Sequence, residues 1–301
     1  MKSNFKRYFK VIIIILLLIL SLKDTSYLTR NIKVYTNIFI NNFYPSALIF
    51  YLLSSIIIEY QVIEEIIKLL KVNITKIYII IISIITGTPG STKILKEMFD
   101  KKIISEKNAN ELIMYTHFPN PLFVLTTVSI IVNSKKISHL ILISIILSNI
   151  IIGLIMSKKE KINNNINISI NNKNTFSKVL EISIFKTIKL IVLIYGISIF
   201  FYLISVLFSH YLNLNIYLDT IISGLFDLTN GVLKTVIIKD IKIRSLLIII
   251  FISLAPISIH FQVKSIIDNS KILYRNFLLG RIFQCIISLS IYIILYKLFI
   301  S

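Results

Sequence analysis

Long apolar runs, separated by short polar stretches, follow one another along most of the chain. A helix needs about 20 apolar residues to cross the hydrocarbon core of a bilayer. The pattern therefore predicts an all-α, polytopic integral membrane protein with about seven to nine hydrophobic segments. The runs fall at about residues 8–22, 43–58, 77–86, 121–133, 137–156, 188–208, 216–233, 246–259 and 277–300.

Helix-breaking and polar residues interrupt two of these runs. Residues 86–90 read Thr-Gly-Thr-Pro-Gly, and residues 255–260 read Ala-Pro-Ile-Ser-Ile-His. Such residues are tolerated at membrane depth only where protein or water satisfies the freed backbone groups. Interruptions at corresponding places in two halves of a transporter point to its substrate site. The pattern therefore predicts two broken or re-entrant helices, one in each of two pseudo-repeats, that meet at a shared cavity.

One polar stretch is long enough to divide the chain into two membrane halves. It is rich in Asn and Lys, covers residues 158–175, and is expected to form a flexible cytoplasmic connector. The predicted halves are residues 1–157 and residues 176–301, each with one interruption. The first apolar run follows a basic N-terminus and lacks a cleavage signal, so we expect an uncleaved first span.

The distribution of Lys and Arg predicts which loops face the cytoplasm. Seven lysines lie in residues 157–189 and four basic residues lie in 234–245, whereas residues 209–215 contain neither Lys nor Arg. The first two segments are therefore expected inside and the third outside. Basic residues flank 77–90 and 246–262 on both sides, so both segments are expected to enter and leave the membrane on the same face.

Two polar segments are expected to form short helices outside the membrane. Residues 59–76 have the pattern of an amphipathic linker helix. Residues 91–116 are expected to form two helices, the first capped by Ser91 and the second by Ser105.

The composition excludes several functional classes. Apolar residues make up 55% of the chain and the mean hydropathy is +0.83, more apolar surface than a soluble protein can bury. The formal charge is +19, but the chain has no polar domain that could bind nucleic acid through it. We attribute the charge to Lys and Arg in the loops, which set the membrane topology, and expect no nucleic acid partner. The single Cys285 excludes an internal disulfide and a cysteine metal cluster. No catalytic motif occurs, so we expect no enzyme, no metal and no cofactor.

Hydroxyl-bearing residues and glycines lie around the predicted start of a helix at the first interruption. A half-helix that begins near Ser91 would direct its free N–H groups and positive dipole end toward the membrane interior, which suits a carboxylate or phosphate. An ordinary loop at the end of a span explains the same residues equally well. The candidate binding residues here are Thr86, Gly87, Gly90 and Ser91.

A second polar element, Thr116 to Pro121, leads directly into an apolar run. Its two prolines favour the start of a span. His117 and Asn120 are candidates to face a cavity. The alternative for His117 is an unremarkable position at the membrane interface.

An acidic residue lies within the run 216–233, which we interpret as a membrane span. A carboxylate inside a span is costly and is usually functional. Asp227 is therefore a candidate for coupling to a cation or proton, with Thr229 and Asn230 beside it. The structural alternative is an ion pair with a basic residue on a neighbouring helix, such as Arg281.

Polar side chains alternate after the second interruption. If the backbone is extended there, Ser258, His260 and Gln262 lie on one side and form a row of hydrogen-bonding groups for a polar ligand. On a helix they would instead be spread around the circumference.

At these residues the chain resembles the sporulation integral membrane protein YlbJ family, part of a wider group with nucleoside-recognition Gate domains. The resemblance covers most of residues 40–300 in the same order. The chain departs from the family pattern in having Asp227 where the family has Glu and Asn276 where it has Pro. The resemblance rests on Gly87-Thr88-Pro89-Gly90 with Ile103-Ile104-Ser105, on Asn120-Pro121-Leu122-Phe123, on Gly224-Leu225-Phe226-Asp227-Leu228-Thr229 with Gly231, and on Ser258 to Val263 with Ile272, Phe277 and Arg281.

This resemblance implies a membrane protein of endospore-forming bacteria that is needed for spore development. The implied role is movement of dipicolinate, a small anion, across the outer forespore membrane. A nucleoside-type solute transporter and a non-transporting sporulation scaffold are the alternatives. The expected partners are the lipid bilayer and a small anionic or polar solute, and a homo-oligomer or a sporulation protein partner is left open.

Overall fold

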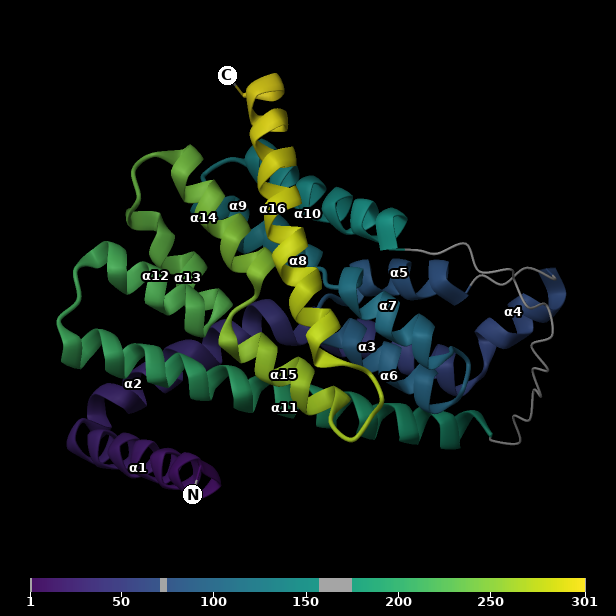
Figure 1. Cartoon of the computed structure of the whole chain (residues 1–301), viewed down its shortest axis with the longest axis horizontal. Coiled ribbons are helices and arrows are strands. Elements are labelled where there is room, and N and C mark those ends of the chain that lie inside the picture. Colours follow the sequence, from purple (N-terminus) through teal and green to yellow (C-terminus); the bar gives the residue numbers. More distant parts are fainter. Residues whose placement is uncertain (1, 71–74, 157–174, 301) are drawn as a thin grey trace.

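The computed structural model describes residues 2–70, 75–156 and 175–300, which form helices joined by short loops (Figure 1). No strand occurs in these ranges, which confirms the predicted all-α class. Of the predicted connector 158–175, only Thr175 lies inside the described residues. The elements are α1 (Lys2–Lys23), α2 (Thr25–Ile38), η1 (Phe39–Phe43), α3 (Tyr44–Glu59), α4 (Val62–Leu70), α5 (Thr75–Thr86), α6 (Gly90–Asp100), α7 (Glu106–Tyr115), α8 (Pro121–Phe123), η2 (Val124–Val128), α9 (Ser129–Ile131), α10 (Lys135–Met156), α11 (Phe176–Leu212), α12 (Ile216–Phe226), α13 (Leu228–Lys234), η3 (Thr235–Ile237), α14 (Ile241–Leu254), α15 (Ile257–Ile267) and α16 (Tyr274–Phe299).

Four of the described helical stretches are long and apolar enough to cross a bilayer. They are α10, α11, α14 together with α15, and α16, with 22, 37, 27 and 26 residues. Shorter apolar helices accompany them, among them α5 and α12. Large apolar side chains remain exposed on these helices, as Leu154 on α10 and Ile286 on α16 illustrate. Such a surface is expected where lipid covers it, and together these features indicate a multi-pass membrane protein.

The first interruption forms the turn of a helical hairpin. Helix α5 ends at Thr86, and α6 begins at Gly90 and packs back against α5. The chain therefore reverses its direction at residues 87–89. Helix α6 starts one residue earlier than predicted. Its N-cap position is held by Pro89, without a side-chain hydrogen bond, so the prediction that Ser91 caps it is wrong.

The run 216–233 is also a hairpin, which corrects its interpretation as a span. Helix α12 ends at Phe226, the backbone of Asp227 is extended, and α13 packs back along α12. Lys234 Nζ lies 2.7 Å from a carboxylate oxygen of Asp219, so the two ends of the hairpin lie together. Residues 209–215 and 234–245 therefore sit at the same end of the molecule. The charge rule predicted opposite sides for them because 234–245 carries four basic residues and 209–215 carries none.

The second interruption breaks a helix without reversing it. Ala255 has a φ of +62°, and Pro256 occupies the N-cap position of α15. Only these two residues separate α14 from α15, and the two helices form one 27-residue candidate span (Figure 1). The expectation that 246–262 turns back is therefore wrong. A comparable extended segment, residues 116–120, separates α7 from α8.

The two halves of the chain pack on each other through long helices. Helix α10 packs on α16, and α3 packs on α11, which runs along much of the molecule (Figure 1). Helix α11 begins at Phe176, well before the predicted run, because Thr175 caps it by accepting from the backbone N–H of Lys178. Ser105 caps α7 as predicted. The amphipathic linker expected within 59–76 corresponds to α4.

Glycines let the hairpin α12–α13 close tightly, and a pair of alanine variants tests this. A Cβ atom at Gly231 would lie 2.1 Å from Gly224 Cα, whereas one at Gly196 on α11 would meet nothing within 4 Å. Because overpacking forces the backbone apart, we expect Gly231→Ala to lower the free energy of unfolding by about 1–3 kcal/mol. Gly196→Ala should be neutral or slightly stabilising, since alanine favours the helix. Thermal unfolding of both variants in detergent measures the difference, and equal stability would contradict the close packing.

Candidate functional site

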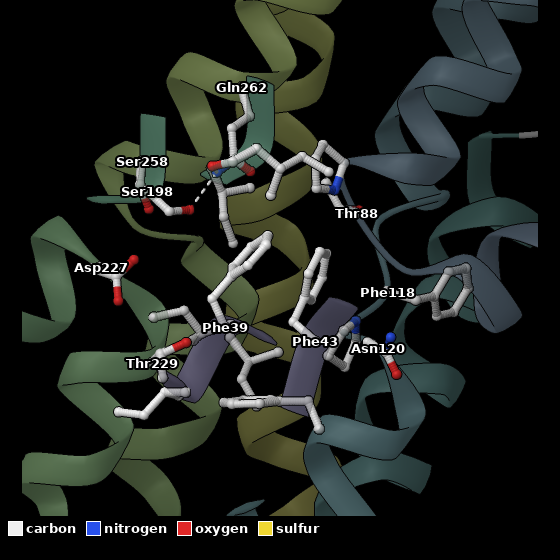
Figure 2. A pocket seen from close by; sticks show the side chains of 18 of the residues that line it. Phe39, Phe43, Thr88, Phe118, Asn120, Ser198, Asp227, Thr229, Ser258 and Gln262 are labelled. Carbon is white, nitrogen blue, oxygen red and sulfur yellow. Dashed lines mark hydrogen bonds between the residues drawn. The ribbon is translucent and has the colours of Figure 1, made fainter. Parts of the chain in front are cut away.

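A cavity lies where the hairpins and the broken helices meet. Its empty space is about 890 Å³, including the part open to the surroundings. Figure 2 shows Thr88 and Asn120 on one side and Asp227, Ser198, Ser258 and Gln262 on the other, with Phe39 and Phe43 between them. Both interruptions of the sequence therefore reach a single cavity.

The first hairpin turn is held against the segment 116–120. The Thr88 N–H donates to the Phe118 carbonyl at 2.8 Å. Gly87 has a φ of +68°, and a Cβ atom there would lie 2.7 Å from Asn120 N, so only glycine fits. This contact brings Thr88, Pro89 and Asn120 to the cavity wall. The Asn120 side chain also caps α8 by accepting from the Leu122 N–H at 2.9 Å.

Asp227 lies at the turn of the second hairpin and is only 2% exposed. One carboxylate oxygen accepts from the Asn230 N–H at 3.0 Å and so caps α13, while the other accepts from the Tyr35 hydroxyl at 3.1 Å. Among residues 2–70, 75–156 and 175–300, no Lys or Arg forms an ion pair with it. The suggested partner Arg281 instead donates to Gln284 and to the Met114 carbonyl.

The polar residues after the second interruption are separated by the helical geometry of α15. Ser258 and Gln262, four residues apart, share one face and line the cavity. Gln262 Nε2 donates to Ser198 Oγ at 2.7 Å (Figure 2). His260 is not among the lining residues. It contacts the Tyr274 hydroxyl at 2.7 Å and the Leu254 carbonyl at 2.9 Å, so the predicted row of three is wrong.

His117 joins the two broken helices. Its Nε2 lies 3.2 Å from the Ile252 carbonyl near the end of α14, and its own carbonyl accepts from Gln284 Nε2 at 3.2 Å. The ring lines the cavity, and Nδ1 has no hydrogen-bond partner within the described part of the chain. His117 is therefore part of the cavity wall and not an interfacial residue.

The predicted site residues thus divide into two groups. Six of them line the cavity: His117, Asn120, Asp227, Thr229, Ser258 and Gln262. The others support the wall from behind or lie away from it. Thr86 donates to the Ile82 carbonyl, Gly90 packs on Tyr51, Ser91 pairs with Thr88, and Asn230 donates to Ser205.

Sequence reasoning missed Tyr35, Phe39 and Ser198, which also line the cavity. Ser198 is a single hydroxyl in a long apolar run, and such residues commonly bond to their own helix backbone. Tyr35 and Phe39 lie in a segment with no interruption to mark it. No local pattern identifies these three residues, because only the packing of α2 and α11 on the hairpins brings them to the cavity.

The wall of the cavity is mostly apolar, with a minority of polar groups, and none of the described residues that line it is Lys or Arg. Four phenylalanines contribute flat apolar surface, namely Phe39, Phe43, Phe118 and Phe123. The N-terminus of α15 lies at the wall without a side-chain cap. Its free N–H groups can receive a negatively charged or hydrogen-bond-accepting group. At the start of α6, by contrast, the N–H groups of Ser91 and Lys93 donate to the Gly87 and Pro89 carbonyls. No group of three or more His, Cys, Asp or Glu side chains able to hold a metal occurs in the described ranges.

Comparisons with known protein families, with curated proteins and with solved structures find no match for this chain.

Access of water to the cavity can be tested with single cysteines. Thr229 lines the cavity and is half-buried, whereas Ser253 is fully buried and bonds to Ser288 on α16. In a Cys285→Ala background, Thr229→Cys should react with a small water-soluble thiol reagent several times faster than Ser253→Cys. Labelling followed by mass spectrometry measures both rates. Equal rates would show that the cavity is closed to water.

Proposed function

We propose that this chain is a membrane transporter that binds a small polar solute in the cavity between its two hairpins and two broken helices. The observation that carries the proposal is that both sequence interruptions, far apart in the chain, line the same cavity. Backbone without regular hydrogen bonds is tolerated at membrane depth when it lines such a cavity. Discontinuous helices around a central site are typical of secondary transporters.

The order of elements supports a repeat arrangement of the kind many transporters have. In the first half, α3 is followed by the hairpin α5–α6, the broken helix α7–α8 and the long helix α10. In the second half, α11 is followed by the hairpin α12–α13, the broken helix α14–α15 and the long helix α16. The equivalent pairs α3–α11 and α10–α16 pack on each other. We propose that the halves are pseudo-repeats and that both hairpins are re-entrant in the membrane.

The family resemblance makes dipicolinate the first candidate solute and the outer forespore membrane the proposed location. A dianion needs positive groups, and the cavity wall offers the N–H groups at the start of α15 in place of Lys or Arg. Lys93 on α6 and Lys264 on α15 do not line the wall. Binding of dipicolinate would therefore rest on helix dipoles and hydroxyl groups.

A nucleoside-type solute is the second candidate, and the lining favours it in one respect. An uncharged ring system does not need a cation, and the phenylalanines offer faces for stacking. Hydroxyl and amide groups such as those of Thr229 and Gln262 could bond to a sugar. The two candidates differ in charge, so a transport assay separates them.

Uptake by proteoliposomes tests the proposal. Vesicles that contain the protein should accumulate radiolabelled dipicolinate or radiolabelled uridine above protein-free vesicles. Thr229→Val keeps the shape of the side chain but removes the hydroxyl from the cavity wall. Loss of one hydrogen bond to the solute should lower the apparent affinity about fivefold to tenfold. Thr29→Val, on an exposed part of α2, is the matched control and should transport like the unmodified protein.

Two outcomes would contradict the proposal. Uptake of neither solute by correctly folded protein would favour a structural role in spore assembly. Equal affinities of Thr229→Val and Thr29→Val would leave transport possible but place the solute elsewhere. Folding is checked by size-exclusion chromatography of each variant before reconstitution.

A further inference from the structure

Asp227 is a buried acid at the cavity wall, yet no Lys or Arg in the described part of the chain forms an ion pair with it. Burial of a carboxylate costs free energy unless hydrogen bonds, a cation or a proton offset the charge. Hydrogen bonds reach it from the Asn230 N–H, the Thr229 N–H and the Tyr35 hydroxyl. The Asn230 N–H belongs to the first turn of α13, so the positive helix end adds a further favourable contribution. The ionised form is thus supported, although less strongly than by an ion pair.

A line of hydrogen bonds connects this carboxylate to the second broken helix. Gln262 Nε2 on α15 donates to Ser198 Oγ on α11. Ser198 is in turn hydrogen-bonded to Tyr35, whose hydroxyl donates to Asp227. Every donor in this line points toward the carboxylate, which is the order that favours negative charge. The line therefore links the hairpin α12–α13 to α15. The two residues between them, Tyr35 and Ser198, belong to α2 and α11.

Protonation would reverse the hydroxyl groups of this line. A protonated Asp227 becomes a donor and turns Tyr35 into an acceptor, so the Tyr35 hydroxyl donates to Ser198. The Ser198 hydroxyl then needs a new acceptor, and the cavity beside it can supply one on a bound solute. Ser258 Oγ is also buried at this wall and has no hydrogen-bond partner within the described ranges. Its hydroxyl therefore also requires an acceptor. The protonation state of Asp227 thus changes which hydrogen-bond donors the cavity wall directs at a solute.

A proton fits this position better than a metal cation. Na⁺ and other hard cations require several oxygen ligands directed at the ion. Here the carboxylate oxygens face an N–H and an O–H donor, and no metal-binding cluster occurs among the described residues. A proton needs only one carboxylate oxygen and access to water, which the adjoining cavity provides.

Other titratable groups on the elements around Asp227 have contacts of their own. Tyr35 on α2 bonds to the carboxylate, and its ring lies tilted against that of Tyr202 on α11, with centroids 4.5 Å apart. His117 lines the same cavity, and its Nε2 lies 3.2 Å from the Ile252 carbonyl. On α12 and α13, Asp219 and Lys234 are paired with each other at the far end of the hairpin. On α15, His260 is bound to Tyr274 and the Leu254 carbonyl. The part of α14 that packs on the hairpin, around Phe251, presents apolar side chains.

From this geometry we infer that Asp227 reversibly binds a proton from the cavity and that this proton is the coupling ion of transport. The inference rests on the transport function proposed above and adds the identity of the driving ion. In the transport cycle, the carboxylate takes up one proton on the side of higher proton concentration and releases it on the other side. The reoriented Tyr35–Ser198–Gln262 line connects that event to the solute.

Infrared difference spectroscopy tests proton binding without transport. Perfusion of the reconstituted protein between alkaline and acidic buffer should produce a carboxylic-acid C=O band. Asp227→Asn should lack the band, and Asp268→Asn, at an exposed position, should retain it. Tyr35→Phe removes the donor that stabilises the ionised form, so the midpoint of this titration should rise by about one pH unit. Absence of the band from the unmodified protein, or its persistence in Asp227→Asn, overturns the inference.

Transport in a sodium-free buffer tests coupling. The probes are radiolabelled dipicolinate and radiolabelled uridine, with the membrane potential held at zero by potassium and valinomycin. An inward gradient of one pH unit should drive about tenfold accumulation if one proton moves with each solute molecule. Asp268→Asn should behave in the same way, and Asp227→Asn should show no accumulation.

The outcomes separate the two proposals. Accumulation that ignores the pH gradient but follows a sodium gradient overturns the proton inference and supports the transport function. An intact infrared titration without transport of either probe overturns the transport function and, with it, the coupling role. Asp227→Glu retains a carboxyl group and should recover part of the proton-driven accumulation, which distinguishes loss of the acid from loss of folding.

Discussion

The structure depends on one constraint, that backbone N–H and C=O groups freed by a broken helix must be satisfied inside the protein. Each break is therefore held by a specific partner. The Thr88 N–H bonds to the Phe118 carbonyl, which fastens the first hairpin turn to the first broken helix. The Asp227 carboxylate receives the Asn230 N–H at the second turn. These contacts bring together segments far apart in sequence, and the cavity lies between them.

The same constraint accounts for one of the two roles that we assign to Asp227, the capping of α13, and the other is the proposed binding of a proton. Its carboxylate caps a short helix, which only Asp, Asn, Ser or Thr does well. It also faces a cavity where its charge has no basic partner. A neutral asparagine would preserve the cap but not the ability to bind a proton. The choice of Asp at this turn is thus informative about chemistry, because capping alone does not require an acid.

The local composition of the sequence was enough to predict the apolar helices and the breaks at residues 86–90 and 255–260, but not the break at Asp227. Loop charge was less reliable. It treated 216–233 as a crossing segment, whereas Lys234 pairs with Asp219 at the base of a hairpin. It also treated 246–262 as re-entrant, whereas α14 and α15 together form one candidate span. An apolar run of this length fits a hairpin or a crossing equally well, and flanking charges cannot distinguish them once one neighbour is misassigned.

Sequence alone determined the all-α membrane class, the two interruptions and the candidate residues His117, Asn120, Asp227, Thr229, Ser258 and Gln262, because apolar length, Gly and Pro positions and a buried acid are local properties. Tertiary structure decided which of these share a wall. It moved His260 away, since a helical α15 places residues 258 and 262 on one face. It also supplied Tyr35 and Ser198, whose importance arises only when α2 and α11 pack beside Asp227. Hydrogen bonds between distant helices leave no periodic trace in a sequence.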